Sequence, residues 1–445
     1  MQLTLLHGAG SSDSYNSSPL PPIIPKQERP LRCVVETPVR SCRIQRNTPP
    51  HLIYNRASFF AVTVMKFLAL ISLLFSSVSF AAPLPAAPSL TAKAYLLYDY
   101  STGQVLLEQN SDTRMEPASL TKLMTAYLTF DALEHDTIQL DEQLVVPQSA
   151  VRNANGESRM LLKVGQSVSV ADLLRGLIVQ SGNDAAMTLA THIAGSEAGF
   201  VEQMNKQVTR LGLTNTHFTN SVGLPNAQHY SSAHDLALIA AAIVRDYPQF
   251  YELFSLREFA FNNVTQANRN RLLWLDPNAD GMKTGHTETA GFCLVGSAKR
   301  DTHRLISVLL GAPSDALRSS ESQQLINYGF QNFDAVSLYK REQVVTELRI
   351  WKGTQSHLEI GFKQDILLSV PKGQLGKLKA TLETRQPLLA PIDSSVAIGV
   401  MKFSLGGKPY AEFPVYPLEN VSAANVFARG WDSIRLLIIK YWPKD

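Results

Sequence analysis

Ser119 and Lys122 have the residue types and the spacing of a nucleophile and its base. A separation of three residues puts both side chains on one face of a helix. Serine is a poor nucleophile at its ordinary pKa, and a lysine can accept its proton only when burial or a second cation keeps that lysine neutral. Backbone N–H groups at a helix start could also stabilise an oxyanion. The same spacing recurs at Ser337–Lys340 and Ser369–Lys372, so a capping serine beside an unrelated surface lysine is the alternative interpretation.

A second polar motif, Ser181-Gly182-Asn183, follows the apolar run at 177–179. The hydroxyl of Ser181 could pass the nucleophile's proton to a leaving amine. The amide of Asn183 could donate to a substrate carbonyl and also accept from the lysine. Because Ser-x-Asn also occurs at Ser14–Asn16, a polar loop between two helices is the alternative for this motif.

The run Lys283-Thr284-Gly285-His286 precedes a predicted strand, and Lys-Thr-Gly occurs once in the chain. On an edge strand, Lys283 and Thr284 offer a cation and a hydroxyl to a carboxylate, and Gly285 lets a substrate approach the backbone. The N–H of His286 could be a second oxyanion donor beside that of Ser119. A turn at the start of a strand is the alternative. The combination of the three motifs favours the catalytic interpretation of each one, because Ser-x-x-Lys, Ser-x-Asn and Lys-Thr-Gly occur together in penicillin-binding proteins and β-lactamases.

These motifs need elements that hold them, and the apolar pattern from residue 94 onward predicts such elements. Strands are expected at 94–99, 104–108, 291–298 and 305–311, and helices at 120–133, 170–193, 200–211, 233–242 and 319–333. Strands at both ends enclosing helices favour an α/β sandwich with one antiparallel sheet and a helical subdomain, over residues 90–335. Short β-type runs then predict a small all-β domain at 340–418.

The first part of the chain has the character of a targeting sequence. Residues 1–64 are rich in Ser, Pro and Arg without periodicity, and we expect them to be a mis-called or disordered extension. Residues 65–81 combine a positive start, an apolar run and small residues before a cleavage point, which is the pattern of a secretory signal peptide. Translation from Met65 is the preferred account, and a cytoplasmic extension before a signal anchor is the alternative.

Residues 423–445 predict an amphipathic helix at the end of the chain. Phe427, Trp431 and Ile438 fall on one side of a helical wheel, and basic residues such as Lys440 fall mainly opposite. Aromatic residues beside basic ones suit a membrane interface. A terminal helix docked on the β domain is the alternative.

Composition narrows the possible partners. A formal net charge of +3, with no basic patch, argues against nucleic acid. Cys33, Cys42 and Cys293 have no metal-ligand spacing, so we expect no metal site. The surroundings of Cys293 predict a buried strand, in which cysteine acts as a small hydrophobic residue.

From residue 94 onward the sequence resembles the low-molecular-mass penicillin-binding proteins, which are serine-type D-alanyl-D-alanine carboxypeptidases; the run Tyr230–Asp235 is a further match. The resemblance implies a β-lactamase/transpeptidase-like fold, peptidoglycan stem peptides as substrates, acylation by β-lactam antibiotics and no cofactor. It also implies export and peripheral attachment to the periplasmic face of a bacterial inner membrane. In such enzymes an arginine ahead of the helix after the last core strand helps to hold the terminal carboxylate. Arg318 is the matching position, and Lys283 and Thr284 would share this task.

The resemblance implies a two-step mechanism. Ser119, deprotonated by Lys122, would attack the carbonyl of the penultimate D-alanine. Ser181 would return the proton to the departing D-alanine, while Asn183 holds the amide of the acyl chain. Lys283 would keep Lys122 neutral, and water would hydrolyse the acyl-enzyme without a metal or cofactor.

Three alternatives stay open at the level of sequence. A β-lactamase of class A needs a glutamate-activated water, but the nearest string, Glu202–Asn205, lies in a helical pattern. A D,D-endopeptidase would use the same chemistry on cross-linked peptides. A non-catalytic wall-binding scaffold is disfavoured because all motif residues are present.

Overall fold

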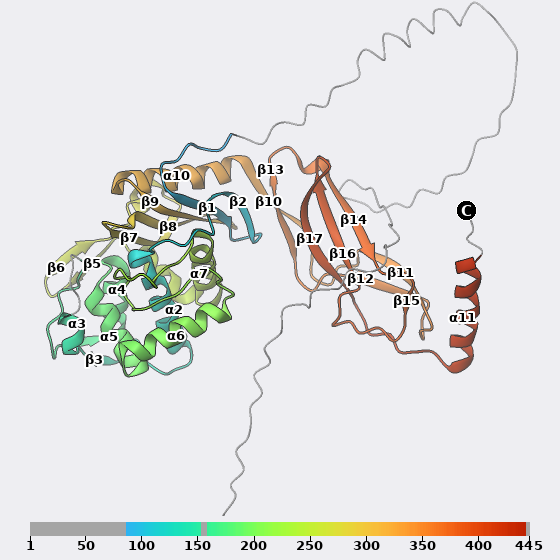
Figure 1. Ribbon diagram of the computed structural model, residues 1–445, viewed down its shortest axis with the longest axis horizontal. Helices are drawn as coiled ribbons and strands as arrows, with labels where there is room; N and C mark the ends of the chain where they lie inside the picture. Colours follow the sequence, from blue (N-terminus) through green and yellow to red (C-terminus); the bar gives the residue numbers. More distant parts are fainter. Residues whose placement is uncertain (1–85, 153–157, 442–445) are drawn as a thin grey trace, which may run out of the picture.

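A five-stranded antiparallel sheet organises the first domain (Figure 1). The computed structural model describes residues 86–152 and 158–441. The strands follow the order β2-β1-β9-β8-β7, with bounds β1 Ala94–Asp99, β2 Gln104–Gln109, β7 Ala279–Thr287, β8 Gly291–Arg300 and β9 His303–Ala312. β7 is therefore an edge strand, as predicted for the Lys-Thr-Gly run.

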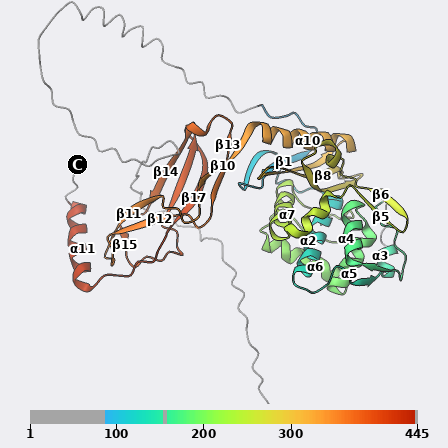
Figure 2. The ribbon, with the colours of Figure 1, turned by 180° about the vertical axis from the view of Figure 1, so that it is seen from behind.

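The two faces of this sheet pack against different helices. Along β1, Leu96 belongs to the large core shared with the helical layer, whereas its neighbour Leu97 packs in a separate cluster with Leu325 and Phe330 of α10 (Asp315–Asn332). Successive side chains of a strand point to opposite faces, so both faces are covered. Figures 1 and 2 show α10 along one face and α7 (Ala233–Asp246) on the other. The predicted α/β sandwich with one antiparallel sheet is confirmed.

The helical layer differs from the prediction at one functionally important point. The expected helix at 170–193 is two helices, α4 (Val170–Val179) and α5 (Asn183–Ala194). The helix is interrupted at Ser181, because its φ of 61° is left-handed and cannot continue a right-handed helix. The N–H of Gly182 turns back to the carbonyl of Gly176. The break thus places Ser181 at a helix junction.

The remaining elements of this domain are short or flank the core. They are η1 Ala118–Thr121, α2 Lys122–Glu134, β3 Gln143–Val145, α3 Gln148–Arg152, β4 Ser167–Ser169, α6 Glu197–Arg210, α8 Pro248–Tyr251, η2 Glu252–Ser255, β5 Glu258–Phe261, β6 Val264–Ala267 and α9 Leu272–Leu275. α2 is the central helix, because it contacts α4, α5, α6 and α7. Eleven of its thirteen residues are buried, which explains its weak amphipathic pattern.

Helix α10 begins earlier than the sequence indicated. Its first residue is Asp315, and the hydroxyl of Ser314 caps it by accepting from the N–H of Leu317. The predicted start at residue 319 is too late. Arg318 therefore lies inside the first turn of the helix, and the expectation that it precedes the helix is wrong.

A second, all-β domain follows α10 directly. Its strands are β10 Phe333–Tyr339, β11 Thr346–Trp351, β12 His357–Gly361, β13 Ile366–Pro371, β14 Leu378–Thr384, β15 Leu388–Leu389, β16 Gly399–Leu405 and β17 Lys408–Pro417, with η3 at Leu375–Lys377. They form a six-stranded sheet and the pair β10–β13 around one apolar core. The first strand thus begins before the predicted domain start at residue 340.

One serine of the β domain connects it to the first domain. The hydroxyl of Ser369 donates to the Oδ2 of the fully buried Asp99 at 2.6 Å, and its N–H donates to the Oε1 of Gln104 at 2.6 Å. The hydroxyl of Thr102 lies 2.6 Å from that of Ser369. The imidazole of His303 also contacts Asp99 Oδ2, at 2.7 Å. Hydrogen bonds to a buried carboxylate are stronger than neutral ones, so this cluster fixes the junction.

The last helix that the structure describes is α11, Val426–Tyr441, which has no buried residue. Phe427 is 90% exposed and Trp431 57% exposed. Within residues 86–152 and 158–441, no helix has the length and apolar character needed to cross a membrane. The predicted extension at 1–64, the signal peptide at 65–81, Cys33 and Cys42 lie outside the described residues.

Candidate active site

The Ser-x-x-Lys motif forms the start of the central helix. Ser119 lies in η1, and Lys122 is the first residue of α2. The Nζ of Lys122 donates to the Oγ of Ser119 at 3.0 Å, to the Oδ1 of Asn183 at 2.7 Å and to the carbonyl of Val222 at 2.8 Å. The first two motifs, separated by some sixty residues in the chain, therefore meet at one amine, as the sequence predicted.

Lys122 is fully buried, and burial is the main reason that its pKa is lowered to about 7. The positive charge of Arg269 lowers this pKa further, whereas Asp184 opposes the change. The sequence assigned the role of the nearby cation to Lys283. The pKa of Lys283 is itself well below its usual range, because of burial and then of Lys122, Arg269 and Arg318. Lys122 thus disfavours the charge of Lys283, whereas burial and Arg269, rather than Lys283, lower the pKa of Lys122 and allow it to exist as a neutral base.

Ser181 lies between α4 and α5 with an unusual conformation. Its Oγ is buried and has no hydrogen-bond partner among the described residues. Its φ of 61° is rare for a residue with a side chain, and such strain is retained where packing enforces it. Asp184 supplies part of that packing, because its carboxylate accepts from the N–H groups of Met160 and Leu162. The junction is therefore fixed, and the hydroxyl stays available for another group.

The edge strand β7 places the third motif against the nucleophile. Lys283 and Thr284 are buried, and the Nζ of Lys283 donates to the carbonyl of Thr284 at 3.0 Å. A Cβ on Gly285 would lie 2.9 Å from the carbonyl oxygen of Pro117 and 3.1 Å from the backbone nitrogen of Ser119. Only glycine permits this approach, so the strand backbone lies beside the Ser119 N–H.

The last residue of the predicted run is exposed. The ring of His286 packs on that of Phe292, with centroids 4.1 Å apart. This contact comes from the neighbouring strand β8, because His286 and Phe292 are register partners. The imidazole is thus held on the sheet surface, and the backbone of His286 follows that of Gly285 along β7.

Arg318 contacts the same strand from the helix behind it. Its Nη1 donates to the carbonyl of Gly285 at 3.0 Å, and its Nη2 forms an ion pair with Asp315 at 2.5 Å. Burial lowers the pKa of this guanidinium, although Asp315 opposes the shift. The structure therefore brings Arg318 to the strand that carries the Lys-Thr-Gly run, with its charge partly balanced by Asp315.

Sequence reasoning missed two parts of this arrangement. The first is Arg269, an exposed residue after β6 whose Nη1 donates to Ser158 Oγ at 3.0 Å. The second is the loop at 219–224, which supplies the Val222 carbonyl to Lys122. Gly223 was the available signal in that loop, because its φ is 90° and a Cβ there would lie 1.9 Å from the carbonyl oxygen of Ala118.

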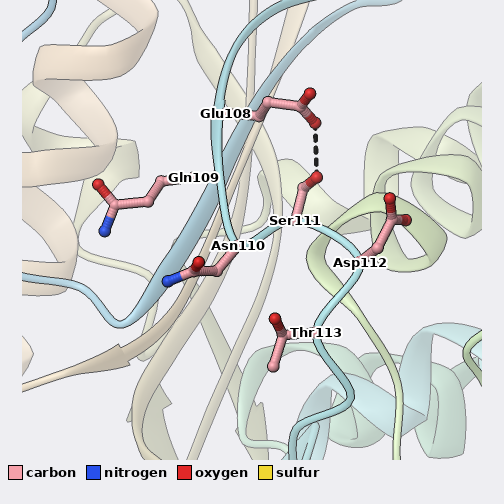
Figure 3. A pocket seen from close by; sticks show the side chains of 6 residues that line it. All are labelled: Glu108, Gln109, Asn110, Ser111, Asp112 and Thr113. Atoms are coloured by element: carbon pink, nitrogen blue, oxygen red, sulfur yellow. Dashed lines mark hydrogen bonds between the residues drawn. The ribbon is translucent and has the colours of Figure 1, made fainter.

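A separate hollow lies just after β2 (Figure 3). It is lined by Glu108, Gln109, Asn110, Ser111, Asp112 and Thr113. None of these is a predicted site residue, and the hydroxyl of Ser111 donates to Glu108 within the hollow. Among the residues that the structure describes, no group of His, Cys, Asp or Glu could hold a metal ion.

The sheet, the central helix and the contact between Ser119 and the buried Lys122 define a serine acyl-transfer enzyme. A family model described as D-alanyl-D-alanine carboxypeptidase matches residues 81–314. A second, described as the C-terminal domain of penicillin-binding protein 5, matches residues 333–423. The chain belongs to the D-alanyl-D-alanine carboxypeptidase family.

Relatives agree with this assignment. The chain is 42% identical to the D-alanyl-D-alanine carboxypeptidase DacC of Escherichia coli, over 82% of this chain and 92% of that protein. The crystal structure of penicillin binding protein 5 from Haemophilus influenzae is 41% identical, with a TM-score of 0.73 over 76% of this chain and 99% of that one. Penicillin-binding protein D2 from Listeria monocytogenes, in its cefotaxime-bound form, is 31% identical, with a TM-score of 0.50 over 55% and 99%.

Proposed function

We propose that the chain removes the terminal D-alanine from peptidoglycan stem peptides through an acyl-enzyme on Ser119, and that β-lactams acylate the same serine. The contact between Ser119 Oγ and Lys122 Nζ carries this proposal, because the amine is buried and its pKa is lowered to about 7. At pH 7 about half of the molecules then have a neutral amine. That amine takes the hydroxyl proton as Oγ attacks the carbonyl carbon of the penultimate D-alanine.

The backbone N–H groups of Ser119 and His286 stabilise the resulting oxyanion. The close approach of Gly285 to the Ser119 nitrogen supports this role, because it puts the two donors on neighbouring segments. Lys122 passes the proton through Ser181 to the departing amine, and the C–N bond breaks. The buried Ser181 Oγ, unpaired within the described part of the chain, supports that relay.

Substrate binding uses the remaining motif residues. The amide of Asn183 accepts from Lys122, and its NH₂ group donates to the amide of the acyl chain. Lys283 and Thr284 hold the terminal carboxylate, and Arg318 adds positive charge from behind the strand. Water then attacks the ester and regenerates Ser119. The cefotaxime-bound relative supports a β-lactam as a substitute for the peptide.

The test uses the purified protein with a labelled penicillin and with a peptide that ends in D-Ala-D-Ala. Mass spectrometry locates the adduct, and released D-alanine reports turnover. A stable adduct on Ser119 together with D-alanine release is the expected result, and Ser119→Ala is the control that loses both. Rapid loss of the adduct without peptide turnover would indicate a β-lactamase. Well-folded protein without any adduct would refute the catalytic assignment.

We further propose that residues 65–81 direct export and that α11 attaches the enzyme to the periplasmic face of the inner membrane. The exposure of Phe427 and Trp431 supports attachment, since an amphipathic helix with aromatic residues partitions into lipid interfaces. The carboxylate of Asp432 in α11 accepts from the N–H of Lys352 in the β domain at 2.6 Å. This contact holds α11 at Asp432, within its second turn, and leaves the side chains of Phe427 and Trp431 exposed.

Cosedimentation with anionic phospholipid vesicles tests the attachment. Phe427→Glu and Trp431→Glu are expected to reduce binding strongly, because each puts a charge on the apolar side of the helix. Ser433→Glu is the matched control, since it adds the same charge near Arg429 and should reduce binding much less. Equal effects of the three substitutions would show that net charge, not insertion, governs binding.

A further inference from the structure

A chain of hydrogen bonds connects a buried histidine to the nucleophile's own peptide unit. The Nε2 of His229 lies 2.8 Å from the hydroxyl of Thr121. That hydroxyl donates to the carbonyl of Ala118 at 2.8 Å. Thr121 stands between Ser119 and Lys122 in the motif, and both His229 and Thr121 are buried. The chain of contacts therefore ends on the carbonyl that precedes the nucleophile.

The direction of each hydrogen bond is fixed by its neighbours. The Nδ1 of His229 accepts from the N–H of Thr219 at 3.0 Å, so the proton of the neutral ring is on Nε2. Thr121 has one hydroxyl proton, which it donates to Ala118, so it accepts from His229. Burial and the nearby His217 lower the pKa of His229 to about 4, which keeps the ring neutral at physiological pH.

The anchored carbonyl determines where the Ser119 N–H points. A trans peptide is planar, so its C=O and N–H point in opposite directions. Ala118 has a φ of 47°, which is left-handed, and its carbonyl also lies against Gly223. We infer that His229 is a positioning residue, which acts through Thr121 and the Ala118 carbonyl to aim the Ser119 N–H at the oxyanion. This inference rests on the proposed function of Ser119.

The same histidine also holds the loop that orients the base. Its bond to Thr219 lies at the start of the loop whose Val222 carbonyl accepts from Lys122 at 2.8 Å. The side chain of Asn220 accepts from the N–H groups of Val222 and Gly223 and gives this loop its shape. His229 thus joins the loop that contacts the base to the turn that carries the nucleophile. A hydrogen-bonded chain also polarises each member, which strengthens the Ser119 N–H as a donor.

The test measures acylation by a labelled penicillin per acylatable site, so that unfolded molecules do not lower the rate. His229→Leu removes both hydrogen bonds and is expected to slow acylation about 10-fold. Thr121→Val is expected to have a similar effect. His229→Gln restores a donor near the position of Nε2 and should recover most of the rate. His217→Leu is the matched control, since that ring contacts Gln228 and Tyr230 outside the chain of contacts and should leave the rate unchanged.

Two further readouts separate positioning from a general structural role. With the D-Ala-D-Ala peptide, His229→Leu should lower kcat and leave KM nearly unchanged, because oxyanion donors act in the transition state. The double variant of His229→Leu and Thr121→Val should be no slower than either single variant, because both break one chain. The inference would be overturned if His229→Leu were acylated as fast as His217→Leu. It would also be overturned if the double variant were slowed by the product of the two single effects. Either result would leave the proposed function intact. A wild-type protein that forms no adduct would overturn both.

Discussion

Replacing Asn183 by aspartate tests directly whether a neutral Lys122 is the base. The substitution conserves the side-chain shape and puts a carboxylate oxygen where the amide oxygen now accepts from Nζ at 2.7 Å. An opposite charge at this distance typically raises the pKa of an amine by about 1–3 units. Since the present pKa is about 7, that of the variant is expected at about 8–10.

The sign of the effect follows from the role of the amine. A base works in its unprotonated form, so the acylation rate rises with pH through the pKa of Lys122. At pH 7 about half of the wild-type amines are neutral, whereas only about 1% are neutral if the pKa is about 9. The acylation rate of Asn183→Asp should therefore fall about 50-fold at pH 7 and recover as the pH rises above about 9.

The assay is the rate of acylation by a fluorescent penicillin between about pH 5.5 and about pH 9.5. Asn183→Ala is the control, because it removes the amide's contact with the substrate without adding a charge. Its rate should be lower at every pH, with an inflection that is not shifted upward. If Asn183→Asp shows the same uniformly lowered profile, with its inflection still near pH 7, then the titration of Lys122 does not control acylation.

Three further predictions follow from other contacts. Gly285→Ala would put a Cβ 2.9 Å from the Pro117 carbonyl oxygen and 3.1 Å from the Ser119 nitrogen, so β7 must shift away from the nucleophile and acylation per folded molecule should fall about 100-fold. A wild-type rate would contradict the placement of the oxyanion site. Ser369→Ala removes the 2.6 Å bond to buried Asp99 and should lower the free energy of unfolding in urea by about 2 kcal/mol, with acylation intact. Burial raises the pKa of the Cys293 thiol to about 11, so mass spectrometry should find this residue unmodified by iodoacetamide at about pH 8 until the protein is unfolded.

The sequence predicted those parts of the site that depend on short-range patterns. The Ser119–Lys122 pair needs only a helix start, and the Lys283–His286 run needs only an edge strand, so each was recognisable from a few residues. The interruption between α4 and α5 at Ser181 was not recognisable in the sequence, because apolar residues continue with helical spacing on both sides of it. Arg318 was placed before its helix because the helix begins at Asp315, after its cap Ser314, four residues earlier than the predicted start at residue 319.

The missed residues are linked to the site only through the tertiary fold. His229 is separated from Thr121 by 108 positions, and Arg269 affects Lys122 from a segment after β6. No spacing rule connects such positions, because their proximity depends on how loop 219–224 packs on α2 and on where the fold places the segment after β6. A lone histidine or arginine in a sequence is more often a structural or surface residue. The hydrogen bonds of His229 and the effect of the Arg269 charge on Lys122 distinguish these two residues.

The site concentrates features that oppose folding. Ala118 and Ser181 adopt left-handed conformations, each at a cost of about 1–3 kcal/mol. Lys122 and Lys283 are buried, although a charged amine prefers water. Each feature is imposed by contacts from another element, such as Gly223 on Ala118 and the Asp184 junction beside Ser181. Because the chemistry requires these same features, substitutions that relieve them should stabilise the fold and weaken catalysis together.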